Sequence, residues 1–98
     1  MIELKRLPEF DAWFDGLKDT DTKARLVVRL KKVARGNLGD VQSVGGGVSE
    51  LREHFGPGWR MYFVQRGVTL IVLLGGGDKS TQQRDIAKAM SLAKTLED

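Results

Sequence analysis

The chain has 98 residues, no cysteine, and 16 lysines and arginines against 13 aspartates and glutamates, which gives a net charge of +3. This length predicts one domain, residues 1–98, with a single core and no separate regulatory domain. Without cysteine, disulfides and thiolate metal sites are excluded. The small basic excess favours a polyanionic partner such as nucleic acid, although many small domains share such a charge.

No part of the sequence indicates export or a membrane. The first ten residues, MIELKRLPEF, lack the apolar core of a signal peptide. The longest apolar run, Leu70–Leu74, is too short to span a bilayer and is expected to be a buried strand. We therefore expect a cytoplasmic protein without a membrane partner.

The N-terminal third predicts one strand and two amphipathic helices. Ile2 and Leu4 alternate with charged residues, which predicts a short edge strand over residues 1–5. Apolar residues at helical spacing predict one helix over 8–18, after a proline start, and a second over 22–35. The first helix is expected to bury Phe10, Trp13, Phe14 and Leu17. The second is expected to bury Leu26, Val27, Leu30 and Val33.

The second helix also carries six cations and no acid between Lys23 and Arg35, so pairing along the helix cannot neutralise them. They form either an ordinary solvated surface or a surface that faces phosphates, and the sequence leaves both interpretations open. In the second case five of them bind RNA, and an aromatic residue of the sheet stacks on a base. These expected RNA contacts are Lys23, Arg25, Arg29, Lys32, Arg35 and Trp59.

Residues 48–74 predict a three-stranded antiparallel meander with strands over 48–55, 59–65 and 68–74. The turns are expected at Gly56-Pro57-Gly58 and at Arg66-Gly67, where glycine permits a positive φ. A three-residue loop would place Arg52 opposite Tyr62, and a two-residue loop would place Tyr62 opposite Ile71.

Alternation along these strands sorts the side chains onto two faces. One face is expected to be a hydrophobic floor made of Leu51, Phe55, Trp59, Met61, Phe63, Leu70, Val72 and Leu74. The other is expected to be polar and to carry Arg52, His54, Arg60 and Tyr62. Arg60 lies mid-strand on this polar face, so we expect it to point away from the core and to reach a phosphate.

Two glycine-rich segments are expected to be loops. Gly39–Gly47 cannot pack much side-chain area and is predicted to be a mobile surface loop. Gly75–Ser80 is placed like a phosphate-binding loop between a strand and a helix. However, Asp78 separates the last glycine from Lys79, which the Walker pattern does not allow.

A C-terminal helix is expected to begin at Ser80, with Ser80 and Gln83 forming a capping box. Its apolar side is expected to consist of Ile86, Met90, Ala93 and Leu96.

The polar face has the chemistry of a metal-free ribonuclease site. No paired carboxylates, metal-ligand cluster or nucleophile triad is present in the sequence pattern, so we expect neither a metal nor a cofactor. RNA supplies its own 2′-hydroxyl nucleophile, arginine can stabilise the phosphorane, and histidine or lysine can move protons. The candidate catalytic residues are Arg52, His54, Arg60, Tyr62 and Lys79.

Each of these residues also has a purely structural interpretation. Arg52 could pair with Glu50 or Glu53, Tyr62 could cover the edge of the core, and His54 could be a simple exposed strand residue. The residues alone leave the structural and the catalytic interpretations open.

The run VSELREHFGPGWRMYF, followed by LLGGGDKSTQQRDI, resembles the HigB-like "addiction module killer" branch of the RelE/ParE toxin superfamily. The resemblance implies an α+β, RelE-like (microbial RNase-like) fold with two N-terminal helices on an antiparallel sheet. It also implies the toxin of a type II toxin–antitoxin module, a ribosome-dependent mRNA endonuclease (mRNA interferase) that inhibits translation. The implied partners are the ribosome, mRNA and a cognate antitoxin, a small helix-turn-helix DNA-binding protein encoded next to the toxin.

By position, the family's arginines match Arg52 and Arg60, its sheet tyrosine matches Tyr62, and its lysine matches Lys79. Trp59 stands where tyrosine is usual, and the tail lacks the histidine or tyrosine that many ribosome-dependent relatives carry. Two other functions fit the same resemblance. One is a non-enzymatic poison of DNA gyrase, and the other is an RNA-binding module without catalysis.

Overall fold

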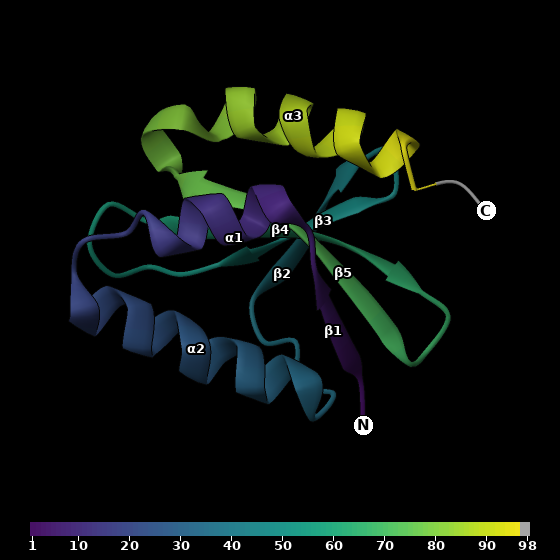
Figure 1. Ribbon diagram of the computed structural model, residues 1–98, viewed down its shortest axis with the longest axis horizontal. Helices are drawn as coiled ribbons and strands as arrows, with labels where there is room; N and C mark the ends of the chain where they lie inside the picture. The colour runs from purple at the N-terminus through teal and green to yellow at the C-terminus, as the bar shows by residue number, and fades with distance from the viewer. Residues whose placement is uncertain (97–98) are drawn as a thin grey trace.

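The computed structural model describes residues 1–96, which form a mixed α+β fold with a five-stranded sheet (Figure 1). In chain order the elements are β1 (Glu3–Arg6), α1 (Pro8–Asp15), α2 (Thr20–Ala34), β2 (Val41–Gly45), β3 (Val48–Arg52), β4 (Trp59–Arg66), β5 (Leu70–Asp78), the short 3₁₀ helix η1 (Lys79–Thr81) and α3 (Gln82–Lys94). The strand order in the sheet is β1-β5-β4-β3-β2. β1 is parallel to β5, and the other neighbours are antiparallel. The predicted edge strand and the three-stranded meander are therefore confirmed.

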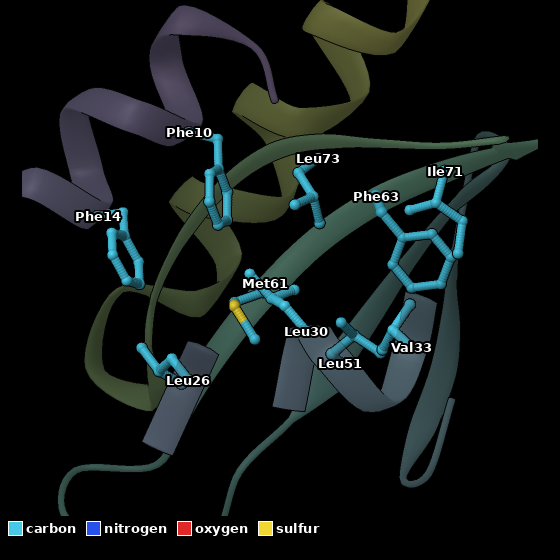
Figure 2. Packing of buried hydrophobic residues seen from close by; sticks show 10 residues of the cluster. All are labelled: Phe10, Phe14, Leu26, Leu30, Val33, Leu51, Met61, Phe63, Ile71 and Leu73. Carbon is cyan, nitrogen blue, oxygen red and sulfur yellow. The ribbon is translucent and has the colours of Figure 1, made fainter. Parts of the chain in front are cut away.

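Helices cover both faces of the sheet, and each face has its own core. On the first face α1 and α2 pack on the sheet through Phe10, Phe14, Leu26, Leu30, Val33, Leu51, Met61, Phe63, Ile71 and Leu73 (Figure 2). On the second face α3 packs on the sheet through Val48, Tyr62, Val64, Val72, Leu74, Ala89 and Ala93. We call these the α1–α2 face and the α3 face. The predicted apolar stripes of all three helices are confirmed, because each one packs against one of these cores.

The helix ends differ from the predicted ones by a few residues. α1 ends at Asp15, before Gly16, rather than at residue 18. α2 begins at Thr20 because the Asp19 carboxylate caps it, accepting hydrogen bonds from Asp21 N and from the Thr22 hydroxyl. The predicted capping box of the last helix is wrong. Asp78 caps η1 instead, accepting bonds from Ser80 N at 2.8 Å and from the Ser80 hydroxyl.

Both predicted glycine-rich loops contain strand. Residues 41–45 form the edge strand β2, which pairs with β3, and Gly46 and Gly47 turn the chain with φ of 61° and 78°. The loop was predicted because glycine-rich sequence can pack little side-chain area. An edge strand is held by backbone hydrogen bonds to its neighbour, so β2 forms without such packing. Gly75–Gly77 lie inside β5.

The predicted register is wrong in both hairpins, with different consequences. Arg52 lies opposite Arg60 rather than Tyr62, a shift of two residues that leaves the faces of β3 and β4 unchanged. In the second hairpin Arg66 pairs with Leu70, and an irregularity in register occurs between Tyr62 and Phe63. The faces of β5 are therefore exchanged.

The exchange moves three residues that were expected on the hydrophobic floor with Phe63. These residues, Leu70, Val72 and Leu74, pack on the α3 face. Ile71 and Leu73 take their place on the α1–α2 face (Figure 2). The polar face is consequently the α3 face, and it is covered rather than open along most of its length.

Two glycines of β5 are required by close packing on opposite sides of the strand. A Cβ on Gly76 would lie 2.5 Å from the ring of Trp13, and a Cβ on Gly77 would overlap the Asp85 carboxylate. Neither glycine has a φ in the left-handed region, so space rather than backbone conformation excludes a side chain.

We predict that Gly76→Ala destabilises the protein by about 1 to 3 kcal/mol, because the rigid indole ring must move to admit the methyl group. Gly75→Ala is the matched control, because a Cβ there meets nothing within 4 Å. Urea denaturation of both variants tests this. Equal stability of the two would contradict the packing described.

Candidate functional site

The pairing of the strands gathers polar residues at one end of the α3 face. In one row across the sheet, Arg52 of β3 lies opposite Arg60 of β4, and Arg60 lies opposite Gly77 of β5. On the β2 side of β3, Arg52 N donates to Asp40 O. The next row places Tyr62 opposite Glu50. We call this region the polar end; it consists of Asp40, Gln42, Glu50, Arg52, Arg60 and Tyr62.

The accessible part of the polar end is organised by the Asp40 carboxylate. Arg52 donates to Asp40 Oδ1 from Nε at 3.0 Å and from Nη2 at 2.8 Å, and its Nη1 donates to Gln42 Oε1 at 2.6 Å. His54 Nε2 lies 2.5 Å from Asp40 Oδ2. The His54 side chain is 69% exposed, whereas that of Arg52 is 33% exposed.

The hydrogen bond with His54, followed by that with Arg52, holds the pKa of Asp40 below the ordinary 3.8. Asp40 is therefore a carboxylate at neutral pH, and it fixes the orientation of the imidazole through Nε2. The other ring nitrogen, Nδ1, makes no hydrogen bond within residues 1–96 and lies on an exposed side chain. An oriented, exposed imidazole of this kind can exchange a proton with a bound molecule.

Sequence reasoning missed Asp40, because it assigned the residue to a loop. The interpretation in which Arg52 pairs with Glu50 or Glu53 is also wrong, since its partner is Asp40. Recognising β2 would have revealed Asp40, since pairing of Val41 with Leu51 places Asp40 beside Arg52.

Arg60 is buried, contrary to the expectation that it points away from the core. Only 5% of the residue is exposed. Its Nη1 donates to the carbonyl oxygens of Glu53 and Trp59, both at 3.0 Å, whereas Nε has no hydrogen-bond partner in the described part of the chain. Arg60 therefore contributes to the structure at the β3–β4 turn as well as carrying a charge.

Tyr62 is also buried, with no exposed surface, and its hydroxyl has no partner among residues 1–96. Burial first, and then the charges of Glu50 and Asp85, raise the pKa of Tyr62 far above its usual range. Glu50 accepts from Gln82 Nε2 at 3.0 and 3.1 Å, and Asp85 accepts from the Thr81 hydroxyl at 2.6 Å. In this conformation Tyr62 is a neutral phenol that cannot contact a substrate.

Lys79 and Arg60 both lie close to Gly58 in the β3–β4 turn. A Cβ on Gly58 would lie 2.7 Å from Lys79 Cδ and 3.7 Å from Arg60 Nη1. Two cations therefore flank this glycine. Neither forms a salt bridge with a carboxylate in the portion of the chain that is described.

Arg29, a predicted RNA contact, is instead committed to the fold. Its guanidinium donates to the carbonyl oxygens of Leu38, Asp40 and Arg52 at 2.7 to 2.8 Å and forms a salt bridge with Glu53. Its side chain is 11% exposed. Arg29 therefore holds α2 against the segments that carry Asp40 and His54.

The other predicted RNA contacts divide into two groups. Trp59 packs against Trp13 with ring centroids 6.3 Å apart and is half-buried, so its ring belongs to the core rather than to an open stacking surface. The four remaining cations lie along α2 and its C-terminal end: Lys23, Arg25, Lys32 and Arg35. Arg25 lies over the ring of Phe55, 3.7 Å from its centroid, which extends the basic surface of α2 to the residue next to His54.

Within residues 1–96, no group of three or more histidine, aspartate or glutamate side chains is arranged to hold a metal ion. No helix in that range is long and apolar enough to cross a membrane.

We predict that Asp40→Asn lowers the melting temperature at pH 7 and flattens its dependence on pH below about 4. A depressed pKa in the folded state contributes stability above the unfolded value of 3.8, and this contribution is lost as the pH falls through the folded value. Melting curves between about pH 2 and pH 7 test this. Glu3→Gln, which removes an exposed carboxylate that forms no salt bridge within residues 1–96, is the control. An acid transition unchanged in Asp40→Asn would contradict the assignment.

Tyr62→Phe should leave the stability unchanged or raise it. A buried hydroxyl without a partner costs about 1 to 3 kcal/mol, and the substitution removes it without creating a cavity. Chemical denaturation measures the difference. A loss of more than about 1 kcal/mol would show that the hydroxyl has a partner in solution.

Comparison with known proteins identifies the family. The family model described as phage-derived protein Gp49-like matches residues 12–97, a span that includes Asp40, Arg52, His54 and Lys79. A relative from Haemophilus influenzae described as "Uncharacterized protein" is 43% identical over 95 residues, which cover 97% of this chain and 96% of the relative. The chain therefore belongs to the Gp49-like family of phage-derived proteins.

Proposed function

We propose that this protein is the toxin of a type II toxin–antitoxin module and acts as a ribosome-dependent mRNA endonuclease that inhibits translation. One observation supports the nuclease activity above the others. His54 is exposed and is held by Asp40, which Arg52 also contacts. This pairing of an accessible imidazole with a carboxylate is a common arrangement for moving protons in catalysis.

The proposed reaction uses the 2′-hydroxyl of RNA as the nucleophile. His54 Nδ1 accepts the hydroxyl proton while the 2′-oxygen bonds to the adjacent phosphorus, and Asp40 stabilises the positive charge that the imidazole gains. The bond from phosphorus to the 5′-oxygen then breaks, and that oxygen takes up a proton from solvent water while the His54 imidazolium returns its proton to the solvent. The products are a 2′,3′-cyclic phosphate and a 5′-hydroxyl, and the atoms balance without a metal or a cofactor.

Arg60 and Lys79 are the proposed binders of the phosphate. A buried guanidinium without a carboxylate partner is costly, and an anion at the Gly58 turn would compensate it. Arg60 donates to the carbonyl oxygen of Glu53, the residue that precedes His54, so its guanidinium lies at the same turn as His54. Lys79 is exposed and can approach an RNA strand directly.

The basic surface of α2 would direct the rest of the RNA to this turn. Arg25 and Lys32 are exposed, and together with Arg29 and Glu53 they line one shallow hollow beside the segment that leads to His54. Contacts with phosphates release counterions, so binding to ribosomes or mRNA through this surface would weaken with salt. A cognate antitoxin, proposed to be a small helix-turn-helix protein encoded next to the toxin, would relieve the toxicity.

The test is His54→Gln, which keeps a polar side chain but cannot accept the proton. Primer extension on mRNA in a translating extract should show cleavage reduced by about 10² to 10⁴-fold, the usual contribution of a general base. Lys94→Gln is the matched control, because Lys94 is an exposed residue at the C-terminal end of α3, the end opposite η1 and Lys79. It should cleave at the unmodified rate.

A folded His54→Gln protein that cleaves as fast as the unmodified protein would refute the role of His54. If the unmodified protein arrests growth but cuts no message in the extract, the nuclease proposal fails. Co-purification with gyrase, or with ribosomes, would then separate the two non-enzymatic functions.

A further inference from the structure

β5 extends past the end of its neighbour β1 and leaves an unpaired edge. β1 pairs only with Leu70–Leu73, and the last backbone bond on that side runs from Leu7 N to Leu73 O at 3.0 Å. The chain then turns away into α1, while β5 continues to Asp78 (Figure 1). Within residues 1–96 no strand pairs with the β1 side of residues 74–78. An unpaired strand edge is a template for another extended chain.

This edge forms the floor of an open groove of about 370 Å³ between α1 and α3. Glu9 and Trp13 line the wall on α1, and Arg84 and Lys88 line the wall on α3. Helices therefore flank the edge on both faces of the sheet and leave the edge itself open. We call this groove the β5 slot.

Gly75, in the floor of the slot, is not explained by the fold. The neighbouring glycines are required by Trp13 and Asp85, whereas a Cβ on Gly75 would meet nothing within 4 Å. Its φ lies outside the left-handed region, so the backbone accepts any residue. The absence of a side chain at Gly75 therefore keeps the strand accessible from the slot.

The charges on the two walls differ. Arg84 and Lys88 lie one turn apart on α3, and both are exposed. Arg84 makes only a long 3.5 Å contact, with Asp85, and Lys88 forms no salt bridge in the described part of the chain. Glu9 provides the opposite charge on α1. Successive residues of a strand point to opposite faces, so a strand in the slot would present alternate side chains to the two walls.

We infer that the β5 slot binds an extended segment of a partner protein, which adds as a strand to the free edge of β5. The segment carries acidic side chains toward Arg84 and Lys88, and the alternate side chains, apolar or basic, face Trp13 and Glu9. Only the identity of the partner, the antitoxin, rests on the proposed function. RNA fits the slot less well, because Glu9 on the α1 wall would repel phosphate. Asp85 on the α3 wall is buried and accepts a hydrogen bond from the Thr81 hydroxyl, so Arg84 and Lys88 determine the charge that this wall presents.

The probe is a set of short, overlapping, fluorescein-labelled peptides that cover the protein encoded next to this chain. Binding is measured by fluorescence anisotropy with the full chain. At least one peptide should bind, and Gly75→Leu should weaken its binding by about tenfold or more, because the new side chain fills the slot. Ala87→Leu places the same side chain on an exposed position of α3 that does not line the slot, and it should bind normally.

A charge reversal provides a second variant, which also serves if Gly75→Leu fails to fold. Lys88→Glu should weaken the binding of the same peptide, whereas Lys94→Glu, at an exposed position near the end of α3 that does not line the slot, should not. Moving the methyl group of an N-methylated residue along the peptide should abolish binding at every second position, because only alternate backbone N–H groups of a strand face β5.

Three results would overturn the inference: no peptide binds, the bound peptide is insensitive to both slot variants, or N-methylation follows no alternation. A labelled RNA oligonucleotide that loses affinity with Gly75→Leu would assign the slot to RNA and would also refute the inference. The cleavage assay without the partner separates this test from the proposed function. Gly75→Leu should cleave normally, whereas a failed nuclease proposal leaves peptide binding unaffected.

Discussion

The guanidinium of Arg29 joins helix α2 to two other segments of the chain. It donates four hydrogen bonds, to the carbonyl oxygens of Leu38, Asp40 and Arg52 and to the Glu53 carboxylate. These segments are the entry to β2 and the exit from β3, which carry Asp40 and His54. The rigid, planar fork of arginine suits such a role, and its partly buried charge is compensated by the carboxylate and the carbonyl dipoles. The orientation of the candidate catalytic pair therefore depends on a residue of α2 that touches neither member's side chain.

Helices cover both faces of the sheet. This covering decides which residues of the polar end a substrate can reach. At the polar end Arg60, Tyr62 and Glu50 are buried, and two of their polar atoms, Arg60 Nε and the Tyr62 hydroxyl, lack partners in the described chain. Where α3 does not reach, at the exit of β3, His54 and Arg52 are accessible. The proposed proton transfer is consequently confined to the exposed end of the site, at the exit of β3. The buried guanidinium of Arg60 can still contribute its positive charge to phosphate binding there.

Sequence periodicity predicted the helices and the meander because the apolar residues of each element must face a core. Phe10, Phe14, Leu26 and Leu30 repeat at helical spacing for this reason, and each is buried. The register was not predictable in the same way. Leu70–Leu74 is apolar at every position, so it can be buried on either face, and the irregularity beside Tyr62 decided which side chains joined Phe63. Pattern alone therefore could not separate the two faces of β5.

The site was predictable only where a residue's role depends on its type rather than on its surroundings. His54 and Arg52 could be proposed from the sequence because imidazole and guanidinium groups are suited to proton transfer and phosphate binding. Asp40 was missed because its role arises from a pairing between β2 and β3 that glycine-rich sequence does not indicate. The glycines of β5 show the same limit. Gly76 and Gly77 are required by side chains of α1 and α3, whereas Gly75 beside them is required by no neighbouring side chain. The three glycines look alike in the sequence. Only the packed structure distinguishes a glycine that the fold needs from one that leaves a surface open.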